Sequence, residues 1–251
     1  MRAAKDLSSS SSSSPPGAGA GSLVGTSNVH FAQRFGLAPI GTVAHEWVMG
    51  IAALTGAYQT ANEVALQQWV ACFGTSLSIA LTDTFGTPQF LQCFRRTSAG
   101  RRTYAEIFAG VRQDSGDPFE FVRLMRRFYD SVGIQDRKAI IFSDSLDVEK
   151  CLQYKQAAEA HGFAASFGVG TFLTNDFVHR STAKKGDKSI PLNIVIKIAS
   201  VNGRPAVKIS DNIGKNTGDE QEVRRVKEEL GYQEKQWGGG DEMRRWGGNR
   251  D

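Results

Sequence analysis

The sequence has few cysteines and no long apolar run, and each shortage excludes a class of protein. Cys72, Cys93 and Cys151 are the only 3 cysteines in 251 residues, and no two of them form a CxxC pair. This set argues against a disulfide-stapled secreted domain and a zinc site, and it predicts free, buried thiols in a reducing compartment, the cytoplasm or the nucleus. No apolar run approaches the roughly 20 residues of a membrane-spanning helix, so no membrane partner is expected.

A strong excess of one charge is also lacking. The chain has 30 basic and 26 acidic side chains, a net charge of +4, and the two signs are interspersed. Such a surface is typical of a soluble globular protein, and a nucleic-acid partner is not expected. The basic stretch RRTSAGRR, residues 95–102, is interpreted as a solvated loop.

The two ends of the chain have little to bury. Ser, Pro, Gly and Ala dominate the start, and glycines dominate the end, so neither end offsets the entropy cost of ordering. The predicted organisation is a disordered leader over 1–22, a partial α/β barrel carrying the active-site loops over 23–190, a β-hairpin and helix over 191–232, and a flexible tail over 233–251.

Short apolar runs alternate with amphipathic segments in the folded part. PIGTVA, LSIALTD, EIFAGVRQD, KAIIFSD and FAASFGVG are each followed by a segment of helical periodicity, which predicts parallel β/α units. GTSN closes one more expected strand near the start. The number of units falls short of the eight that a complete barrel needs, so the pattern fits either an incomplete (β/α) barrel or an open doubly wound sheet.

The pattern changes after residue 190. LNIVIKIAS and PAVKIS are two β-rich runs joined by VNGR, and an Asn-Gly pair between such runs predicts a hairpin. DEQEVRRVKEELGY then predicts an exposed helix that ends at Gly231. Asp117, directly before Pro118, is expected to cap an earlier helix.

Polar residues recur where the predicted strands end. Asp83, Asp114 and Asp144 follow one another at intervals of about 30 residues, and Gly168 and Gly170 stand in the next unit. The carboxyl ends of parallel strands meet at one edge of a sheet, so these residues are expected to line one pocket.

The chemistry of these residues suits a phosphorylated substrate. The turn FGVGT offers backbone N–H groups to an anion, although such a turn alone is more often only a tight turn. Arg112 can grip a phosphate or carboxylate, and an aspartate can hold sugar hydroxyls or Mg²⁺. His45 is a base or nucleophile if Asp83 is its partner, and otherwise a satisfied core histidine.

Several motifs together carry a family resemblance: GTSNVHFA, IGTVAHEWVMG, IALTDTFGT, GVRQDSGDP, FSDSLDVEKC, SFGVGTFLTNDF, PLNIVIKI, VKISDNIGKNTGD and VRRVKEELGY. From about residue 24 to 246 the sequence resembles nicotinate phosphoribosyltransferases of the fungal type. The resemblance implies a type II phosphoribosyltransferase fold, an irregular α/β barrel. It also implies that nicotinate and phosphoribosyl pyrophosphate are joined, with hydrolysis of ATP and with Mg²⁺, into nicotinate mononucleotide for NAD biosynthesis.

The same resemblance assigns roles to residues. It implies that His45 is phosphorylated by ATP, that Asp83 orients it and that Glu46 belongs to the catalytic group. It implies substrate contacts for Thr26, Ser27, Arg112, Asp114, Ser115, Asp144, Gly168, Gly170 and Thr171, with the glycine turn receiving the 5′-phosphate. No residue is assigned as a direct metal ligand. Related nicotinamide-using enzymes have an aspartate in place of Ser27, whose hydroxyl can instead donate to the carboxylate of nicotinate.

The resemblance covers the later part of the family's sequence. Family members have an N-terminal region that supplies the start of the barrel and an aromatic residue that stacks on the pyridine ring, and this region is not found in the chain. Two hypotheses follow. One is an active enzyme that works as a homodimer; the other is a truncated, catalytically inactive chain, including one that pairs with a full-length subunit.

Overall fold

The computed structural model describes residues 22–175, 177–180, 186–192, 194–212 and 214–233. Nearly all of the predicted leader and tail therefore lies outside the described residues. The chain divides into two compact units, residues 1–42 and 43–251, which are described separately. The segment 191–232, expected as an appendage, belongs to the second unit.

The described part of the first unit holds one helix, α2 (Val29–Phe35). The side chain of Asn28 accepts a hydrogen bond from the main-chain N–H of Phe31 at 3.0 Å and so caps the first turn. Thr26 forms a single parallel bridge with Pro39. The expected GTSN strand is reduced to that bridge within the described residues.

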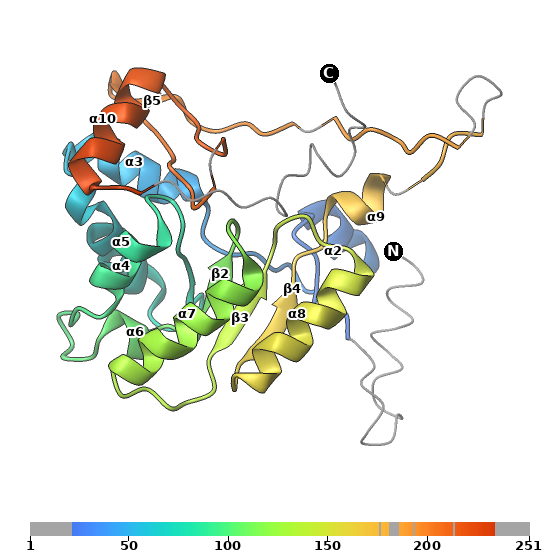
Figure 1. The fold of residues 1–251 in the computed structure, drawn as a ribbon, viewed down its shortest axis with the longest axis horizontal. Coiled ribbons are helices and arrows are strands. Elements are labelled where there is room, and N and C mark those ends of the chain that lie inside the picture. The colour runs from blue at the N-terminus through green and yellow to red at the C-terminus, as the bar shows by residue number, and fades with distance from the viewer. Residues whose placement is uncertain (1–21, 176, 181–185, 193, 213, 234–251) are drawn as a thin grey trace. The chain divides into compact units, whose positions relative to one another are not determined.

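A parallel four-stranded sheet forms the centre of the second unit (Figure 1). Its strands are β1 (Ile79–Leu81), β2 (Gly110–Gln113), β3 (Ala139–Phe142) and β4 (Ala164–Phe167), paired in chain order. Val111 lies opposite Ile140, and both are fully buried. Four of the predicted strands thus exist, and their carboxyl ends share one edge. PIGTVA, residues 39–44, is the exception, because it forms no strand and leads into a helix.

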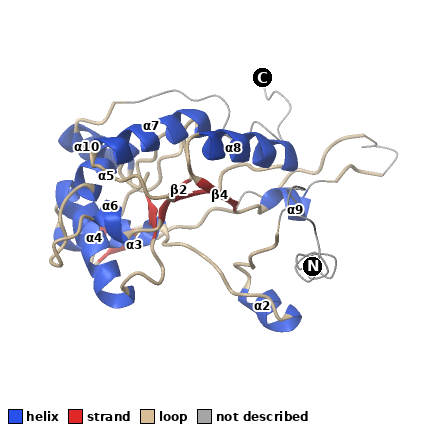
Figure 2. Cartoon of the chain, turned by 90° about the horizontal axis from the view of Figure 1, so that it is seen from below, coloured by secondary structure: helices blue, strands red, loops and turns tan. Residues whose placement is uncertain are grey.

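Helices cover the sheet. Helices α7 (Pro118–Ser131) and α8 (Val148–Ala160) contact each other, and Figure 2 shows both on the same side of the sheet. The carboxylate of Asp117 accepts hydrogen bonds from the first turn of α7, as the sequence predicts. The other helices of this part are α3 (His45–Thr55), α4 (Tyr58–Phe73), α5 (Thr87–Phe94), α6 (Tyr104–Ile107) and α9 (Thr171–Asn175).

The segment after residue 190 is less regular than predicted. Only β5 (Ser200–Val201) and β6 (Arg204–Pro205) pair antiparallel, across the Asn-Gly turn, and the described residues of the run LNIVIKI form no strand. Helix α10 (Glu220–Leu230) begins at its cap Asp219 and ends at Gly231, where φ is 59°.

A second core fixes the segment that follows β6. Val207 and Ile209 are fully buried against side chains of α3, α4 and α10, and the N–H of Ile209 donates to the carbonyl of Thr84 at 2.8 Å. Burying two such side chains contributes roughly 3–6 kcal/mol. The segment therefore lies firmly across the carboxyl edge of the sheet.

The state of the cysteines and the length of the helices can be compared with the predictions from the sequence. All three cysteines are free thiols, as predicted, but only Cys93 is buried, and Cys72 is exposed. Among the described residues, no helix combines the length and the apolar content needed to cross a membrane.

Candidate functional site

His45 begins helix α3 and is held through both ring nitrogens. Only 4% of the residue is exposed. Nδ1 lies 3.1 Å from Thr84 Oγ1, and Nε2 lies 2.9 Å from Asp114 Oδ2. Asp83 Oδ1 is farther from Nε2, at 3.7 Å. The hydrogen bond that the sequence assigned to Asp83 is therefore made by Asp114, which approaches from the next strand of the sheet.

Asp114 is the centre of the cluster. Its Oδ1 accepts hydrogen bonds from Arg112 at 2.6 Å and from the Ser143 hydroxyl at 2.7 Å, and Lys208 Nζ lies 4.0 Å from Oδ2. Burial alone would raise the pKa of Asp114, but the hydrogen bond to His45 and the nearby positive charges outweigh it and hold the pKa below its ordinary value. Asp114 is therefore ionised at neutral pH.

Asp83 is a second, fully buried carboxylate beside the imidazole. Its Oδ2 accepts a hydrogen bond from Ser115 Oγ at 2.6 Å, and Lys208 Nζ lies 3.6 Å away. Its Oδ1 faces His45 and has no hydrogen-bond partner among the described residues. The buried ammonium group of Lys208 thus compensates two carboxylates at once, which makes it essential to the balance of charge.

The trio of His45, Asp83 and Asp114 has the spacing of a metal site, with one ligand atom from each within 4.8 Å of the others. The ammonium of Lys208 already lies between the two carboxylates, however, and Asp114 is also bonded to Arg112. A divalent cation at this point would be repelled by both positive groups. We therefore describe the trio as an ion-pair cluster.

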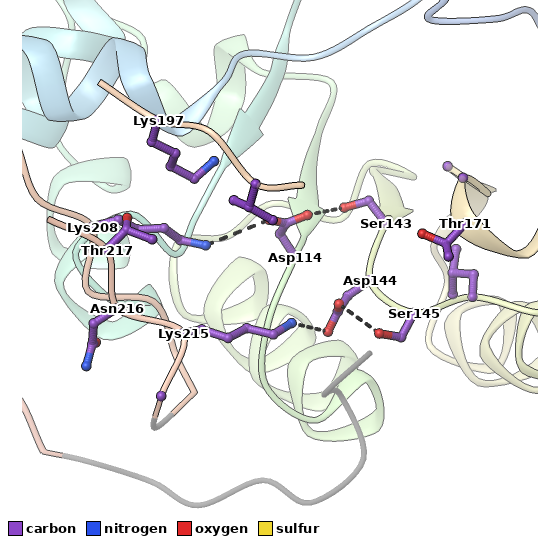
Figure 3. A pocket seen from close by; sticks show the side chains of 15 residues that line it. Asp114, Ser143, Asp144, Ser145, Thr171, Lys197, Lys208, Lys215, Asn216 and Thr217 are labelled. Carbon is purple, nitrogen blue, oxygen red and sulfur yellow. Dashed lines mark hydrogen bonds and ion pairs between the residues drawn. The ribbon is translucent and has the colours of Figure 1, made fainter. Parts of the chain in front are cut away.

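A cavity of about 500 Å³ lies beside the cluster at the carboxyl edge of the sheet. Figure 3 shows lysine side chains reaching toward the aspartates at the strand ends. The strand-end residues that line it are Asp114, Ser143, Asp144, Gly168, Gly170 and Thr171, and the C-terminal segment adds Lys197, Lys208, Lys215, Asn216 and Thr217. Five residues predicted from far-apart motifs thus share one cavity.

The charges in this cavity are only partly compensated. Lys215 Nζ donates to Asp144 Oδ2 at 2.7 Å, yet burial raises the pKa of Asp144 above its ordinary value. Burial lowers the pKa of Lys197, and the charge of Lys208 adds to the effect. A ligand that brings negative groups together with a cation would stabilise the charged forms of both Asp144 and Lys197.

The glycine turn provides space in the cavity. Neither Gly168 nor Gly170 has a left-handed φ, so backbone geometry alone does not require glycine. A Cβ at Gly168 would lie 3.6 Å from Ser143 Cβ, and a Cβ at Gly170 would meet no atom within 4 Å. A side chain at 170 would therefore occupy room that the cavity leaves for a ligand.

The variant Gly170→Leu is expected to bind inorganic pyrophosphate at least about tenfold more weakly, because the new side chain would fill space beside the lysines, a loss of about 1.4 kcal/mol. Its thermal midpoint should match that of the unaltered protein. Titration calorimetry and a melting curve measure the two effects. Gly100→Leu, at an exposed glycine that also lacks a left-handed φ, is the matched control, and equal pyrophosphate affinity in the two variants would contradict the assignment.

Other predicted residues lie elsewhere. Glu46 Oε1 accepts a hydrogen bond from the N–H of Ile198 at 2.7 Å, so it anchors the segment that carries Lys197 and does not contact the imidazole. Ser115 lies behind Asp83 and does not line the cavity. Thr26 and Ser27 belong to the first unit and are described only within it.

The sequence prediction missed the lysines. Lys208 and Lys215 belong to the motif VKISDNIGK, which carries the resemblance but has no periodicity that marks a site. The available signal was that a motif carrying the resemblance holds two lysines. Lys197 lies in the apolar run PLNIVIKI, where a single charge within a predicted strand was the corresponding clue.

Comparison with known proteins identifies the family of the chain. The model of the nicotinate phosphoribosyltransferase (NAPRTase) family matches residues 2–234. The chain belongs to the nicotinate phosphoribosyltransferase family. The match includes the serine run at residues 8–14.

Among similar family members, the nicotinate phosphoribosyltransferase of Saccharomyces cerevisiae is 50% identical over 227 residues, which cover 89% of this chain and 51% of that protein. The one from Methanococcoides burtonii is 43% identical, covering 81% of this chain and 47% of that protein. The crystal structure of nicotinate phosphoribosyltransferase from Vibrio cholerae matches with a TM-score of 0.75 at 41% identity, over 84% of this chain and 48% of that one. The chain spans about half the length of these relatives.

Proposed function

We propose that this chain carries the phosphoribosyl-transfer site of a nicotinate phosphoribosyltransferase. The reaction joins nicotinate to phosphoribosyl pyrophosphate with the help of ATP and yields nicotinate mononucleotide for NAD biosynthesis. The names of the relatives support this activity. The observation that carries it is the contact between His45 and Asp114, at a cavity lined by three lysines and a glycine turn.

The sheet is proposed to be part of an irregular (β/α) barrel. The strand order β1-β2-β3-β4 runs without a reversal, whereas a doubly wound sheet changes direction at a switch point. Consecutive parallel neighbours are the arrangement of barrel strands. This order favours the barrel over the doubly wound alternative.

The cavity is proposed to bind phosphoribosyl pyrophosphate. Lys197 and Lys215 supply positive charge, and Gly170 leaves room for a phosphate group. Asp144 pairs with Lys215 in the structure; once Lys215 turns to a phosphate group, the Asp144 carboxylate would be an oxygen ligand for Mg²⁺. Bound Mg²⁺ would neutralise charge on the pyrophosphate leaving group. Asp114 would stabilise the positive charge that develops on the ribose as the bond at C1 breaks.

His45 is proposed to accept the γ-phosphoryl group of ATP. An ionised Asp114 can only accept, so a neutral imidazole donates its one proton from Nε2 to Asp114 Oδ2 and keeps its lone pair on Nδ1, 3.1 Å from the Thr84 hydroxyl. In place of its contact with Thr84, this lone pair would bond to the γ-phosphorus while the bond from phosphorus to the bridging oxygen breaks and ADP leaves with its electrons.

The activity is tested by incubating the full chain with ATP, Mg²⁺, phosphoribosyl pyrophosphate and labelled nicotinate. Labelled nicotinate mononucleotide should form only when phosphoribosyl pyrophosphate is present. Folded protein that yields no product would contradict the proposed function.

Preference for nicotinate is proposed to rest on Ser27, whose hydroxyl can donate to a carboxylate. In the variant Ser27→Asp, a carboxylate would repel nicotinate and accept from the amide of nicotinamide. We expect relative use of nicotinamide to rise about tenfold or more in a competition assay with both substrates. Ser27→Ala removes the hydroxyl without adding charge and should not show this reversal; unchanged selectivity in Ser27→Asp would refute the charge argument.

A second copy of the chain is proposed as its partner. Ile190, Leu192, Ile194, Val195 and Ile196 are each at least 64% exposed, and an apolar run this exposed is typical of an interaction surface. Light scattering after size-exclusion chromatography should give the mass of a dimer. Leu192→Lys together with Ile196→Lys should give a monomer, and a monomeric unaltered chain would reject the pairing.

A further inference from the structure

Asp211 connects two loops at the carboxyl edge of the sheet. Its carboxylate accepts two hydrogen bonds from Thr87 at the start of α5, from the main-chain N–H at 2.7 Å and from Oγ1 at 2.5 Å. Its own main-chain N–H donates to Ser115 Oγ at 3.0 Å. Ser115 Oγ in turn donates to Asp83 Oδ2 at 2.6 Å. An unbroken chain of contacts thus runs from α5 to the carboxylate beside His45.

The direction of these hydrogen bonds determines which oxygen of Asp83 faces His45. Because Ser115 Oγ accepts the N–H of Asp211, its single proton is left for Asp83 Oδ2. The other oxygen, Oδ1, then faces His45 Nε2 at 3.7 Å. The anchored segment also carries Lys208, whose Nζ lies 3.6 Å from Asp83 Oδ2.

We propose that Asp211 is a positioning residue for the His45 site. By anchoring the segment 208–211 to α5, it holds Ser115 and Lys208 against Asp83 and fixes the Asp83 carboxylate at the imidazole. The effect on phosphoryl transfer rests on the proposed function, whereas the effect on Asp83 does not.

The charge on Asp211 costs stability. Burial and the charge of Asp83 raise its pKa to about 6 from 3.8, and Lys208 opposes them. Because the folded pKa is above the unfolded one, this residue makes the protein less stable as the pH rises from 3.8 to about 6.

A second cavity, of about 570 Å³, gives access to Asp211. Its lining includes Thr87, Ser115 and Asp211 together with the charged residues Asp117, Glu120 and Arg127. Truncating Asp211 to alanine would leave a hole at the edge of this cavity, of a size that a one-carbon carboxylate can fill. Position 211 is therefore suited to chemical rescue by formate.

The first experiment reads Asp83 directly and needs no enzymatic activity. In the full chain with ¹³Cγ-labelled aspartate, the carboxyl resonance of Asp83, assigned from Asp83→Asn, should shift in Asp211→Ala. It should return toward its original position on addition of sodium formate and not on addition of sodium chloride at equal concentration. Glu120→Gln, at the same cavity but outside the contact chain, should leave the resonance unchanged. An unshifted resonance in Asp211→Ala, or one that formate does not restore, would overturn the proposal.

Asp211→Asn replaces Asp211→Ala in the test if the alanine variant does not fold. In the unaltered chain the Asp83 resonance should show a step near pH 6, where Asp211 takes up a proton. His45 and Lys208 also face Asp83, and their titration can move its resonance as well. The test therefore compares the pH dependence of the resonance in the unaltered chain with that in Asp211→Asn. Loss of the step in Asp211→Asn supports the proposal, and an identical step in both proteins refutes it.

The second experiment measures transfer to His45. Labelling by γ-³²P-ATP should fall about 10- to 100-fold in Asp211→Ala, the loss typical of removing an outer positioning contact, and formate should restore it. Pyrophosphate affinity should fall less than labelling does, because Lys197 and Lys215 of the first cavity lie outside the anchored segment 208–211. An unaltered chain that takes no label, with the Asp83 effect still present, would refute the enzymatic function and leave the positioning role supported.

Discussion

Replacement of His45 by alanine is expected to abolish incorporation of labelled γ-phosphate from ATP. The imidazole is the nucleophile in the proposed step, and among the described residues no other histidine lies in the cluster formed with Asp83 and Asp114. The measurement is acid-sensitive labelling of the protein followed on a gel. Nicotinate mononucleotide formation should fall with it, because the ATP-dependent part of the reaction is lost.

Two variants make the His45 test specific. His161→Ala removes a ring at the end of α8 whose Nδ1 lies 2.8 Å from the carbonyl of Ala157, and it should keep full labelling. His45→Asn can retain the contact with Thr84 and guards against a folding defect. Labelling of His45→Ala at the level of the unaltered chain would contradict the assigned role.

The second large effect is expected from Asp114→Asn. The amide removes the negative charge that His45, Arg112 and Lys208 share. Loss of one such electrostatic contact costs about 10²- to 10³-fold in rate, and leaving partly buried cations unpaired costs about 3 kcal/mol of stability. Steady-state kcat/KM and urea unfolding at neutral pH measure the two losses.

The stability loss should depend on pH. The folded pKa of Asp114 is held below 3.8, so its ionisation stabilises the fold above that pH and the contribution is lost as the pH falls. The difference between Asp114→Asn and the unaltered chain should therefore shrink on acidification. Asp144→Asn is the matched control, because burial raises the pKa of Asp144 and its neutralisation should cost less. Equal losses in both variants would contradict the assigned charge balance.

Local patterns in the sequence were sufficient for much of the fold. The runs ending at Asp83, Asp114 and Asp144 predicted β1, β2 and β3, because a buried strand leaves an apolar stretch that ends where the chain meets polar surroundings. The same logic placed the aspartates on one edge. Capping chemistry likewise located Asp117 and Gly231.

Other segments did not follow their local pattern. PIGTVA and LNIVIKI have strand-like composition but form no strands among the described residues. A high β-propensity means that the side chains suit the surface of a sheet, but a segment becomes a strand only if a neighbouring strand is present to pair with it. That neighbour is a matter of tertiary structure, which local composition does not record.

The sequence by itself determined the family, the four strands of the sheet and the gathering of aspartates and glycines at their ends, since each follows from local periodicity or from motif identity. Only the tertiary structure decided that Asp114 binds His45, that Lys208 compensates both carboxylates and that Asp211 anchors them. The physical reason is that such contacts depend on the orientation of side chains brought together by long-range packing, and a difference of about one ångström selects between two neighbouring carboxylates.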